Sequence, residues 1–444
     1  MEFFNELGRL VERRWRDANY SEEAFPEISE QALTEADATS RVDAWEVVRT
    51  LHEGTDLPPQ RDDEFSDLPI ILYSGPRFQI DLYFWLDGTT SVHEHGFSGA
   101  FQVLLGSSIH SRYDFAREMK VSEHFSTGHV LFRNVEGLSK GDIRRILPGG
   151  EFIHSLFHLD RPSATITVRT KQAPSALPQF NYLKPYLAVN PFHKEQTTLK
   201  KVRSVSMLLS IGHPEAYPFI GELISSSDLQ TTFLVLTATF ENLISRAQPT
   251  GEASGAPDVS QDEWDRFHGL FKAAHRRHGQ LVNLLPPVLG EMQRERALVE
   301  RRSQMTGSEH RFFLALLLNV PRGKLILDLV KQRFPERDAA DTICDWVAEF
   351  AGMPSPRSPE QNVLGIDGFG ETHRLVLRSL LKGHAPERMM SDPELGDAAG
   401  GAGRPADLGV VLRSFRGSVL LKSLLETPPT VDDADSTLAH AATA

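Results

Sequence analysis

Hydrophobic and polar positions follow three different patterns along the chain. In roughly the first 60 residues, apolar side chains recur at helical spacing, with Phe3, Leu7 and Val11 on one face. From about residue 70 to 170, short apolar runs are separated by Gly, Asp, Ser and Asn, which is typical of many short strands. From about residue 196, helical spacing returns in longer segments. The pattern predicts an α+β protein with several domains.

The central part contains nine strand-like segments in about 100 residues, and this density predicts a β-sandwich or barrel. In chain order they read PIILYS, FQIDLYFWL, TSVHEHG, AFQVLLG, SIHSRYDF, HVLFRNV, DIRRILPG, EFIHSLFHL and SATITVRT. We therefore expect four parts along the chain. They are an N-terminal helical segment packed on the barrel at 1–60, the β-barrel at 61–195, an all-α domain at 196–427 and a disordered tail at 428–444.

The helical part has no fixed-period sequence repeat, which argues against a solenoid. His268, His275 and His278 fall at i, i+7 and i+10 and share roughly one helix face. The stretch KAAHRRH, which contains two of them, predicts a solvated basic face, and the alternative is a contact surface for an acidic partner. Cys344 lies in an apolar helical segment and is expected to be buried and inert.

Composition narrows the possible chemistry. The chain has 444 residues and a single cysteine, which excludes disulfide frameworks, zinc ribbons and cysteine-held iron–sulfur clusters. Any metal must therefore be held by carboxylates or by some of the 17 histidines. The net charge of −13 argues against non-specific binding of nucleic acid. The N-terminus has no apolar signal-peptide core and no apolar run spans a bilayer, so we expect a cytoplasmic protein without nucleic-acid or membrane partners.

The most informative stretch is GTTSVHEHGFSGAFQVLLG. His93 and His95 lie two residues apart in a predicted strand, where alternation points both side chains to one face. Two imidazoles about 6–7 Å apart along a strand can bind one ion. We expect His154, on a later strand, as the third ligand, and His158 is the alternative because it faces the same side. Glu94 points to the opposite face and is expected in solvent or in a surface salt bridge.

This arrangement resembles the cupin superfamily. The residues that carry the resemblance are Gly88, His93, His95 and Gly106 in a first motif and Pro148, Gly150 and His154 in a second. The position of the family's glutamate ligand falls on Gly99, so the chain is similar to the three-histidine cupins of the thiol dioxygenase (cysteine dioxygenase) branch. The resemblance covers about residues 70–170 and implies a cupin-like β-barrel, which is a double-stranded β-helix.

The resemblance also implies a mononuclear Fe(II) centre held by His93, His95 and His154, with Mn, Ni or Zn as alternative metals. It implies a dioxygenase or related oxidoreductase that acts on dioxygen and a small substrate, which in that branch is a thiol or amino-acid-like molecule. Three neutral imidazoles leave up to three open positions on the ion. They also leave its charge uncompensated, which favours an anionic donor atom on the substrate.

Arg112, Tyr113 and His158 are the candidate catalytic residues. The side chains that could line the mouth of the site are Tyr73, Tyr83, Trp85, Arg112 and Tyr113. Strand alternation alone does not decide which of them point inward. The positions of the family's Ser-His-Tyr set hold Thr167, Arg169 and Lys171.

Two other functions stay open at this stage. The β domain could be a non-catalytic metal- or ligand-sensing module, fused to a helical scaffold that binds a protein partner. A different cupin chemistry, such as isomerisation or lyase action with Mn, Ni or Zn, is the third possibility. A 2-oxoglutarate hydroxylase is disfavoured, because the His-x-Asp/Glu pair of that class requires a carboxylate at the position of His95.

Overall fold

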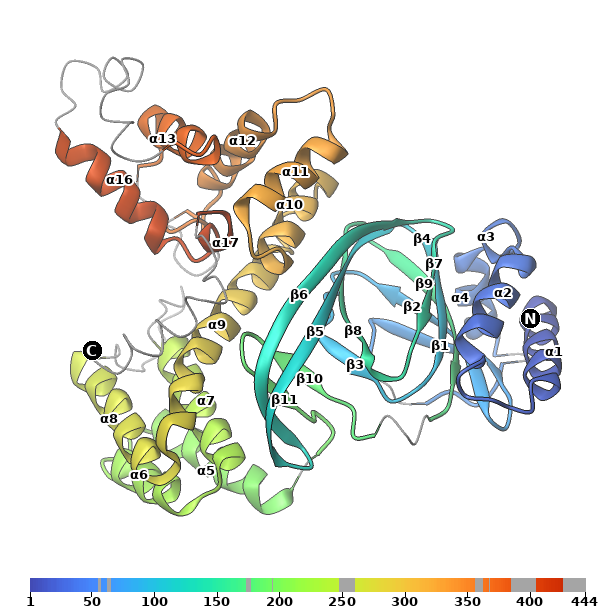
Figure 1. The fold of residues 1–444 in the computed structure, drawn as a ribbon, viewed down its shortest axis with the longest axis horizontal. Helices are drawn as coiled ribbons and strands as arrows, with labels where there is room; N and C mark the ends of the chain where they lie inside the picture. The colour runs from blue at the N-terminus through green and yellow to red at the C-terminus, as the bar shows by residue number, and fades with distance from the viewer. Residues whose placement is uncertain are drawn as a thin grey trace. The chain divides into compact units, whose positions relative to one another are not determined.

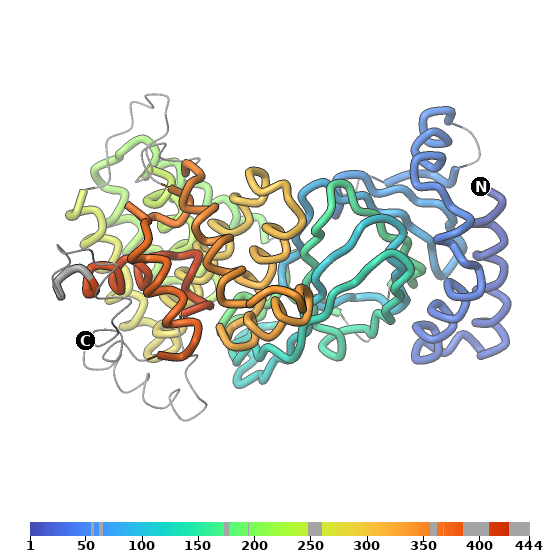
Figure 2. Tube along the Cα trace, turned by 90° about the horizontal axis from the view of Figure 1, so that it is seen from above, coloured from blue at the N-terminus to red at the C-terminus, as the bar shows by residue number. Residues whose placement is uncertain are grey.

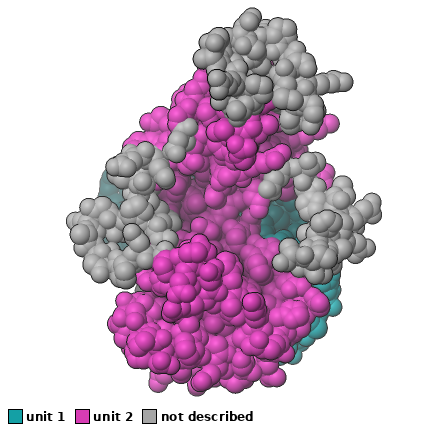
Figure 3. Space-filling view, turned by 90° about the vertical axis from the view of Figure 1, so that its left-hand side faces the viewer, with its two compact units in different colours: residues 1–193, 306–312 teal, residues 194–305, 313–444 magenta. Residues whose placement is uncertain are grey.

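The computed structural model describes residues 1–54, 57–61, 65–172, 177–193, 195–246, 260–355, 362–366, 368–384 and 405–425. The chain divides into two compact units, which Figure 3 colours separately. Unit 1 comprises Met1–His193 and Thr306–Phe312, and unit 2 comprises Lys194–Met305 and Phe313–Ala444. The tail at 428–444, which we expected to be disordered, lies outside the described residues. The other boundaries, at 60, 195 and 427, stay predictions.

Unit 1 begins with amphipathic helices. They are α1 (Glu2–Asp17), α2 (Phe25–Ala36), α3 (Ala38–Arg41) and α4 (Ala44–Glu53). In α1, the buried residues Phe4, Leu7, Val11 and Trp15 recur every three or four positions, so one stripe of the helix is apolar. These residues share a hydrophobic core with a five-stranded sheet, and the helices lie beside that sheet in two views (Figures 1 and 2).

The five-stranded sheet has the strand order β1-β2-β9-β4-β7. Its strands are β1 (Leu68–Ser74), β2 (Phe78–Trp85), β9 (Ser163–Thr170), β4 (Gly99–Leu105) and β7 (Ile143–Ile146). All neighbours pair antiparallel, and β2 pairs with β9 along its whole length, from Phe78 opposite Thr170 to Trp85 opposite Ser163. Strands distant in sequence therefore form the centre of this sheet.

Strand β2 is buried on both faces. Alternate residues, including Phe78, Ile80 and Leu82, pack in the core formed with the N-terminal helices. The residues between them, including Gln79 and Asp81, point to the opposite face. There the Gln79 amide and the Tyr83 hydroxyl both donate hydrogen bonds to the Asp81 carboxylate, at 2.8 and 2.9 Å. One strand thus supplies an apolar face to the helices and a polar face to the interior between the two β layers.

The second β layer is a closed barrel with the strand order β10-β11-β6-β5-β8-β3. Its strands are β10 (Asn181–Leu183), β11 (Leu187–Val189), β6 (Phe125–Ser139), β5 (Ser107–Ser122), β8 (Gly149–His158) and β3 (His93–His95). A hydrophobic cluster joins this layer to the five-stranded sheet, because Phe101 and Val103 of β4 pack with Phe152 and Leu156 of β8. The interior between the two layers is where the histidines lie.

The nine predicted strand segments correspond to β1–β9. Two differences have a physical cause. Strands β5 and β6 are longer than their apolar runs, because much of each strand is half-buried or exposed. The exposed part of β5 carries the charged residues Arg117, Glu118 and Lys120. Strands β10 and β11 were not predicted, because each has three residues and is held by partners remote in sequence, β3 and β6.

The α+β class is confirmed by this architecture. A closed six-stranded antiparallel barrel with a histidine cluster fits a cupin-like fold only loosely. The double-stranded β-helix arrangement stays a prediction.

The described part of unit 2 is helical, as expected for the C-terminal region. Its helices are α5 (Gln196–Ser210), α6 (Ala216–Ser226), α7 (Leu229–Arg246), α8 (Gln261–His278), η2 (Gly279–Leu284), α9 (Leu285–Arg301), α11 (Gly323–Arg333), α12 (Ala339–Ala351), α13 (Glu371–Leu381), α16 (Pro405–Gly417) and α17 (Lys422–Leu425), and α10 (Ser308–Asn319) runs through the division between the units. Among the described residues, no helix combines the length and apolarity needed to cross a membrane.

Candidate metal centre

The structure brings together the three histidines that the sequence pattern selected. His93 and His95 lie on β3, and His154 lies directly opposite His93 on β8. One ring nitrogen from each histidine lies within 4.8 Å of the other two, and the three side chains are at most 5% exposed. This group could therefore hold one metal ion.

The local geometry follows from strand alternation and an irregular register. His93 and His95 are two residues apart, so both face the interior between the β layers. The β3–β8 ladder pairs His93 with His154 and then His95 with Gly149, so the register shifts between the two histidines. Gly149 adopts φ +64°, which favours glycine. Such irregularities re-aim side chains on neighbouring strands, and here they let His95 approach His154.

Hydrogen bonds from β5 and β6 assign the tautomer of His154. The Nδ1–H of His110 donates to the Glu136 carboxylate at 2.9 Å, so the Nε2 of neutral His110 is an acceptor. The Nδ1–H of His154 then donates to that Nε2 at 3.0 Å. Arg144 binds the same carboxylate through two nitrogens, at 2.6 and 2.9 Å. His154 is thereby left with an unprotonated Nε2 that faces the cluster.

His93 has the same tautomer as His154, but a backbone carbonyl fixes it. Its Nδ1–H donates to the Ser91 carbonyl at 2.8 Å, and its Nε2 is buried without a hydrogen-bond partner among the described residues. The Nε2 atoms of His95 and His154 are 2.8 Å apart. Because the Nε2 of His154 is an acceptor, His95 donates to it. A buried ring nitrogen without a partner normally destabilises a fold, and an ion at this point would satisfy it.

Burial keeps all three imidazoles neutral. It lowers the pKa of His93, and it lowers the pKa of His95 and of His154 well below the usual 6.5. The nearby histidines add to the effect, and so do Arg169 at His95 and Arg112 at His154. Neutral imidazole is the form that binds metal, so the donor set suits a divalent cation.

Aromatic side chains surround the cluster. The ring centroid of Phe97 lies 4.5 Å from that of His95, and the centroid of Phe152 lies 4.5 Å from that of His154. Phe65, which is half exposed, packs edge-on to His93 at 6.4 Å and contacts Tyr83 and Trp85 at 5.3 Å each. Phe65 therefore links His93 to the aromatic side chains of Tyr83 and Trp85.

A buried ion pair lies on the wall formed by the five-stranded sheet. The Arg169 guanidinium donates to Asp81 at 2.7 Å, and the Asp81 side chain is only 2% exposed. The charge of Arg169 lies over the ring of Phe97, with 4.9 Å between the guanidinium carbon and the ring centroid. The polar face of β2 and β9 thus carries a charge-balanced network next to His95.

The structure separates the three candidate catalytic residues. Arg112 is the cross-strand partner of His154, faces the same side and covers the ring of Phe152 at 4.1 Å. Tyr113, one residue on, points to the other face of β5 and lies in an apolar cluster with Ile153 and Tyr182. The structure therefore does not bring Tyr113 to the histidines, because alternation places it opposite to Arg112.

His158 is also set apart from the three histidines. Its ring stacks on Trp85 with 4.8 Å between centroids, and its Nδ1 forms a hydrogen bond with the Ser163 hydroxyl at 2.7 Å. It is buried in the wall of the site. These contacts fit a supporting role beside the aromatic group better than a place in the ligand set.

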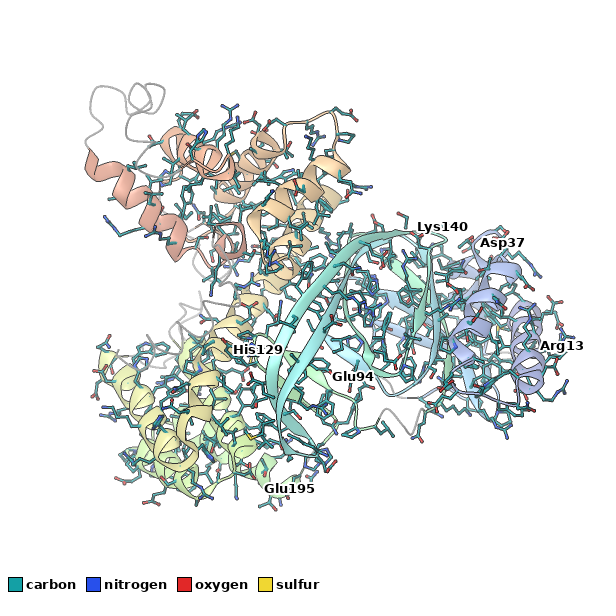
Figure 4. The ribbon with its side chains drawn as sticks, viewed as in Figure 1. Arg13, Asp37, Glu94, His129, Lys140 and Glu195 are labelled. Carbon is teal, nitrogen blue, oxygen red and sulfur yellow. The ribbon has the colours of Figure 1, made fainter. Side chains whose placement is uncertain are left out.

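The expectation for Glu94 was wrong. Glu94 is 4% exposed, and its carboxylate accepts hydrogen bonds from the Tyr182 hydroxyl at 2.6 Å and the Phe180 backbone N–H at 3.1 Å. Burial raises its pKa. Figure 4 labels Glu94 among the barrel strands. The face opposite the histidines is covered by β10 and the segment before it, and the sequence pattern had not predicted that strand.

Sequence reasoning missed the residues that orient His154. No motif in the sequence singles out His110, Glu136 or Arg144. The alternation of side chains along β5 is the one feature of the sequence that points to His110. His110 and Arg112 share a face of this strand, and Arg112 lies opposite His154. Alternation places His110 near His154 only once the pairing of β5 with β8 is known. A comparison with protein-family models and with curated proteins finds no match to this chain.

Proposed function

We propose that the chain is a metal-dependent oxidoreductase with a mononuclear centre held by His93, His95 and His154, acting on dioxygen and a small anionic substrate. The observation that carries the proposal is the convergence of three buried, neutral imidazoles, of which His93 has a ring nitrogen without a partner among the described residues. Imidazole suits Fe, Zn, Cu and Ni. The resemblance to three-histidine cupins favours Fe(II), with Mn, Ni and Zn as alternatives.

The donor set explains why an anionic substrate is favoured. When bound, Fe(II) supplies one-electron chemistry toward dioxygen and open coordination positions for a substrate donor atom. Among the described residues, no carboxylate joins the cluster of His93, His95 and His154, so the three ligands leave the charge of a dication uncompensated. A carboxylate or thiolate on the substrate would supply the missing negative charge.

Arg112 is the residue best placed to bind the substrate anion. Its charge lies near enough to His154 to lower the pKa of that imidazole. One terminal nitrogen donates to the Glu151 carbonyl at 3.0 Å, whereas the buried Nε has no hydrogen-bond partner among the described residues. Arg169 is less available, because Asp81 neutralises it. Arg112 can therefore hold an anionic group beside the ligands.

The remaining side chains orient the ligands and limit access of water. Glu136 and His110 keep the proton of His154 on Nδ1, and Ser91 keeps that of His93 on Nδ1. Phe65, Phe97 and Phe152 surround the ring edges with apolar surface. A dry, low-dielectric site strengthens each charge interaction within it.

The test is metal content followed by oxygen uptake. After anaerobic loading with Fe(II), we expect about one iron per chain, and we expect H93A or H95A to lose it, whereas H129A on the exposed part of β6 keeps it. Iron-loaded protein should then consume oxygen with at least one member of a panel of thiols and amino acids. Protein that stays metal-free after loading would refute the proposed centre.

A second candidate function is metal or ligand sensing without catalysis. The position of Tyr113 favours this function. Tyr113 is a predicted catalytic residue, but its side chain lies in an apolar cluster away from the three histidines. The same experiments separate the two functions. Tight metal binding through His93 and His95 without oxygen uptake on any substrate would support the sensor, with the helical region as the scaffold for a protein partner.

A further inference from the structure

A cleft in the helical unit is independent of the metal centre. It has a volume of about 640 Å³ and is formed by α7, α8, η2 and α9. Its lining residues are Phe240, Trp264, Phe267, His268, Phe271, Lys272, His275, Val282, Asn283, Pro286, Leu289 and Gly290. Ligand pockets in proteins are typically about 300–1,000 Å³ and mostly apolar, with a few polar groups.

The floor of the cleft is aromatic. The rings of Phe240 and Phe267 stack with 5.7 Å between centroids, and Phe271 meets Phe267 edge-on at 5.3 Å. Trp264 meets the same two-ring stack at 6.2 and 6.3 Å. Trp264, Phe267 and Phe271 come from one face of α8 because they recur every three or four residues. An apolar or aromatic ligand body would find a complementary surface here.

The rim of the cleft carries basic side chains along one edge. His268, Lys272 and His275 follow one another at i, i+4 and i+7 on α8, and all three are exposed. None of these three side chains forms a hydrogen bond or ion pair with a described residue, and no described residue in the lining is acidic. The positive charge of Lys272 is therefore not neutralised within the cleft. Lys272 and His275 belong to the basic stretch 272–278 that the sequence pattern had marked.

We propose that this cleft binds an amphipathic organic anion, with its apolar or aromatic body on the phenylalanines and its acidic group at Lys272 and the neighbouring histidines. Charge complementarity selects the anion, because Lys272 is the only formally charged side chain among the described residues of the lining. His278, the third histidine of the pattern, is not part of this rim, since it bonds instead to the Thr232 hydroxyl at 2.9 Å.

The test is calorimetric titration of the full chain with 2-naphthylacetate, and with 2-naphthylethylammonium as a cation of similar shape. We expect saturable binding of the anion and at least tenfold weaker binding of the cation. K272E should weaken anion binding at least tenfold. Equal affinity for both probes, or no saturable binding of the anion, would overturn the proposal. Binding only of an acidic peptide would overturn it too, in favour of a protein partner.

A pair of glycine variants, G290L and G269L, tests the site independently of K272E, in case K272E does not fold. Gly290 lies within α9 and lines the cleft, and a Cβ added there meets no atom within 4 Å. G290L should therefore fold, fill the cleft and abolish binding of 2-naphthylacetate. Gly269 on α8 is equally open but is not in the lining, so G269L should bind the anion as the unchanged chain does. Undiminished binding by folded G290L would place the ligand elsewhere and refute the site.

Discussion

At the scale of single residues, His154 takes its orientation from a chain of side chains on neighbouring strands. His110 links it to Glu136, and Arg144 holds Glu136 in turn. The hydrogen bonds from Arg144 and His110 lower the pKa of Glu136 to about 2, so this carboxylate is charged near neutral pH. A fixed charge behind His110 keeps its proton on Nδ1 and so determines which nitrogen of His154 faces the cluster.

Removing that charge should weaken metal binding without removing a ligand. We expect E136Q to bind Fe(II) or Zn(II) about 10–100-fold more weakly in a competition titration with a chelator, the usual loss for an outer partner of a metal-bound histidine. The matched control is E118Q, because Glu118 pairs with the exposed His129 on the same hairpin. Equal affinities for the two variants would show that Glu136 does not orient the site.

The single cysteine gives a second prediction at this scale. Cys344 is fully buried in α12, as expected from the sequence, and burial raises the pKa of its thiol to about 12. Only the thiolate reacts with disulfide reagents, and below pH 12 the thiol form dominates. We expect Cys344 to resist 5,5′-dithiobis(2-nitrobenzoate) between pH 7 and pH 9 and to react fully in urea. Rapid labelling of native protein at pH 7 would contradict the buried position.

At the scale of elements, the close approach of β4 and β9 in their shared ladder restricts which residue can occupy position 99. Gly99 faces Arg169 across this ladder, and a Cβ added at Gly99 would collide with the backbone carbonyl of Val168. Only glycine therefore fits between the two strands at position 99.

G99A should destabilise unit 1. We expect a loss of about 1–3 kcal/mol in the free energy of unfolding, the usual cost of overpacking, measured by urea denaturation. G137A is the control, because Gly137 on β6 has open space around an added Cβ. It should be neutral or slightly stabilising, since alanine costs less conformational entropy than glycine. Similar losses for both would mean that β4 and β9 are not packed as closely as described.

The strands and helices also show how much of the fold the sequence pattern can predict. The short apolar runs predict β1–β9, because period-two alternation and turn residues are local signals. They do not predict β10 and β11, because these strands exist only where β3 and β6 provide partners. The helix face with His268 and His275 is predicted as well, whereas the cleft beside it requires residues of α7 and α9.

At the scale of the whole molecule, each unit carries its own candidate site. The histidines belong to unit 1, and the aromatic cleft belongs to unit 2. A ligand that binds only the folded state stabilises it by mass action. Loading either site should therefore be visible as a gain in stability, and a variant in one site should abolish the gain from its own ligand.

Metal loading gives the prediction at this scale. At a free metal concentration 100 times the Kd, we expect the free energy of unfolding of unit 1 to rise by about 2.7 kcal/mol. The rise is measured as slower hydrogen exchange of the backbone amides in β3 and β8. H93A should show no such gain, whereas G290L, changed only in the cleft, should show all of it. A gain that persists in H93A would mean that the metal binds somewhere other than the three histidines.

The sequence by itself determined the α+β class, nine of the strands and a pair of histidines on one strand face, because all of these follow from spacing along the chain. Only the tertiary structure decided which side chains meet. It placed His154 opposite His93, joined His110 to His154, buried Glu94 under Tyr182 and turned Tyr113 away from the histidines. The physical reason is that alternation assigns residues to two faces of a strand, whereas strand pairing and the layers above and below decide what each face contacts.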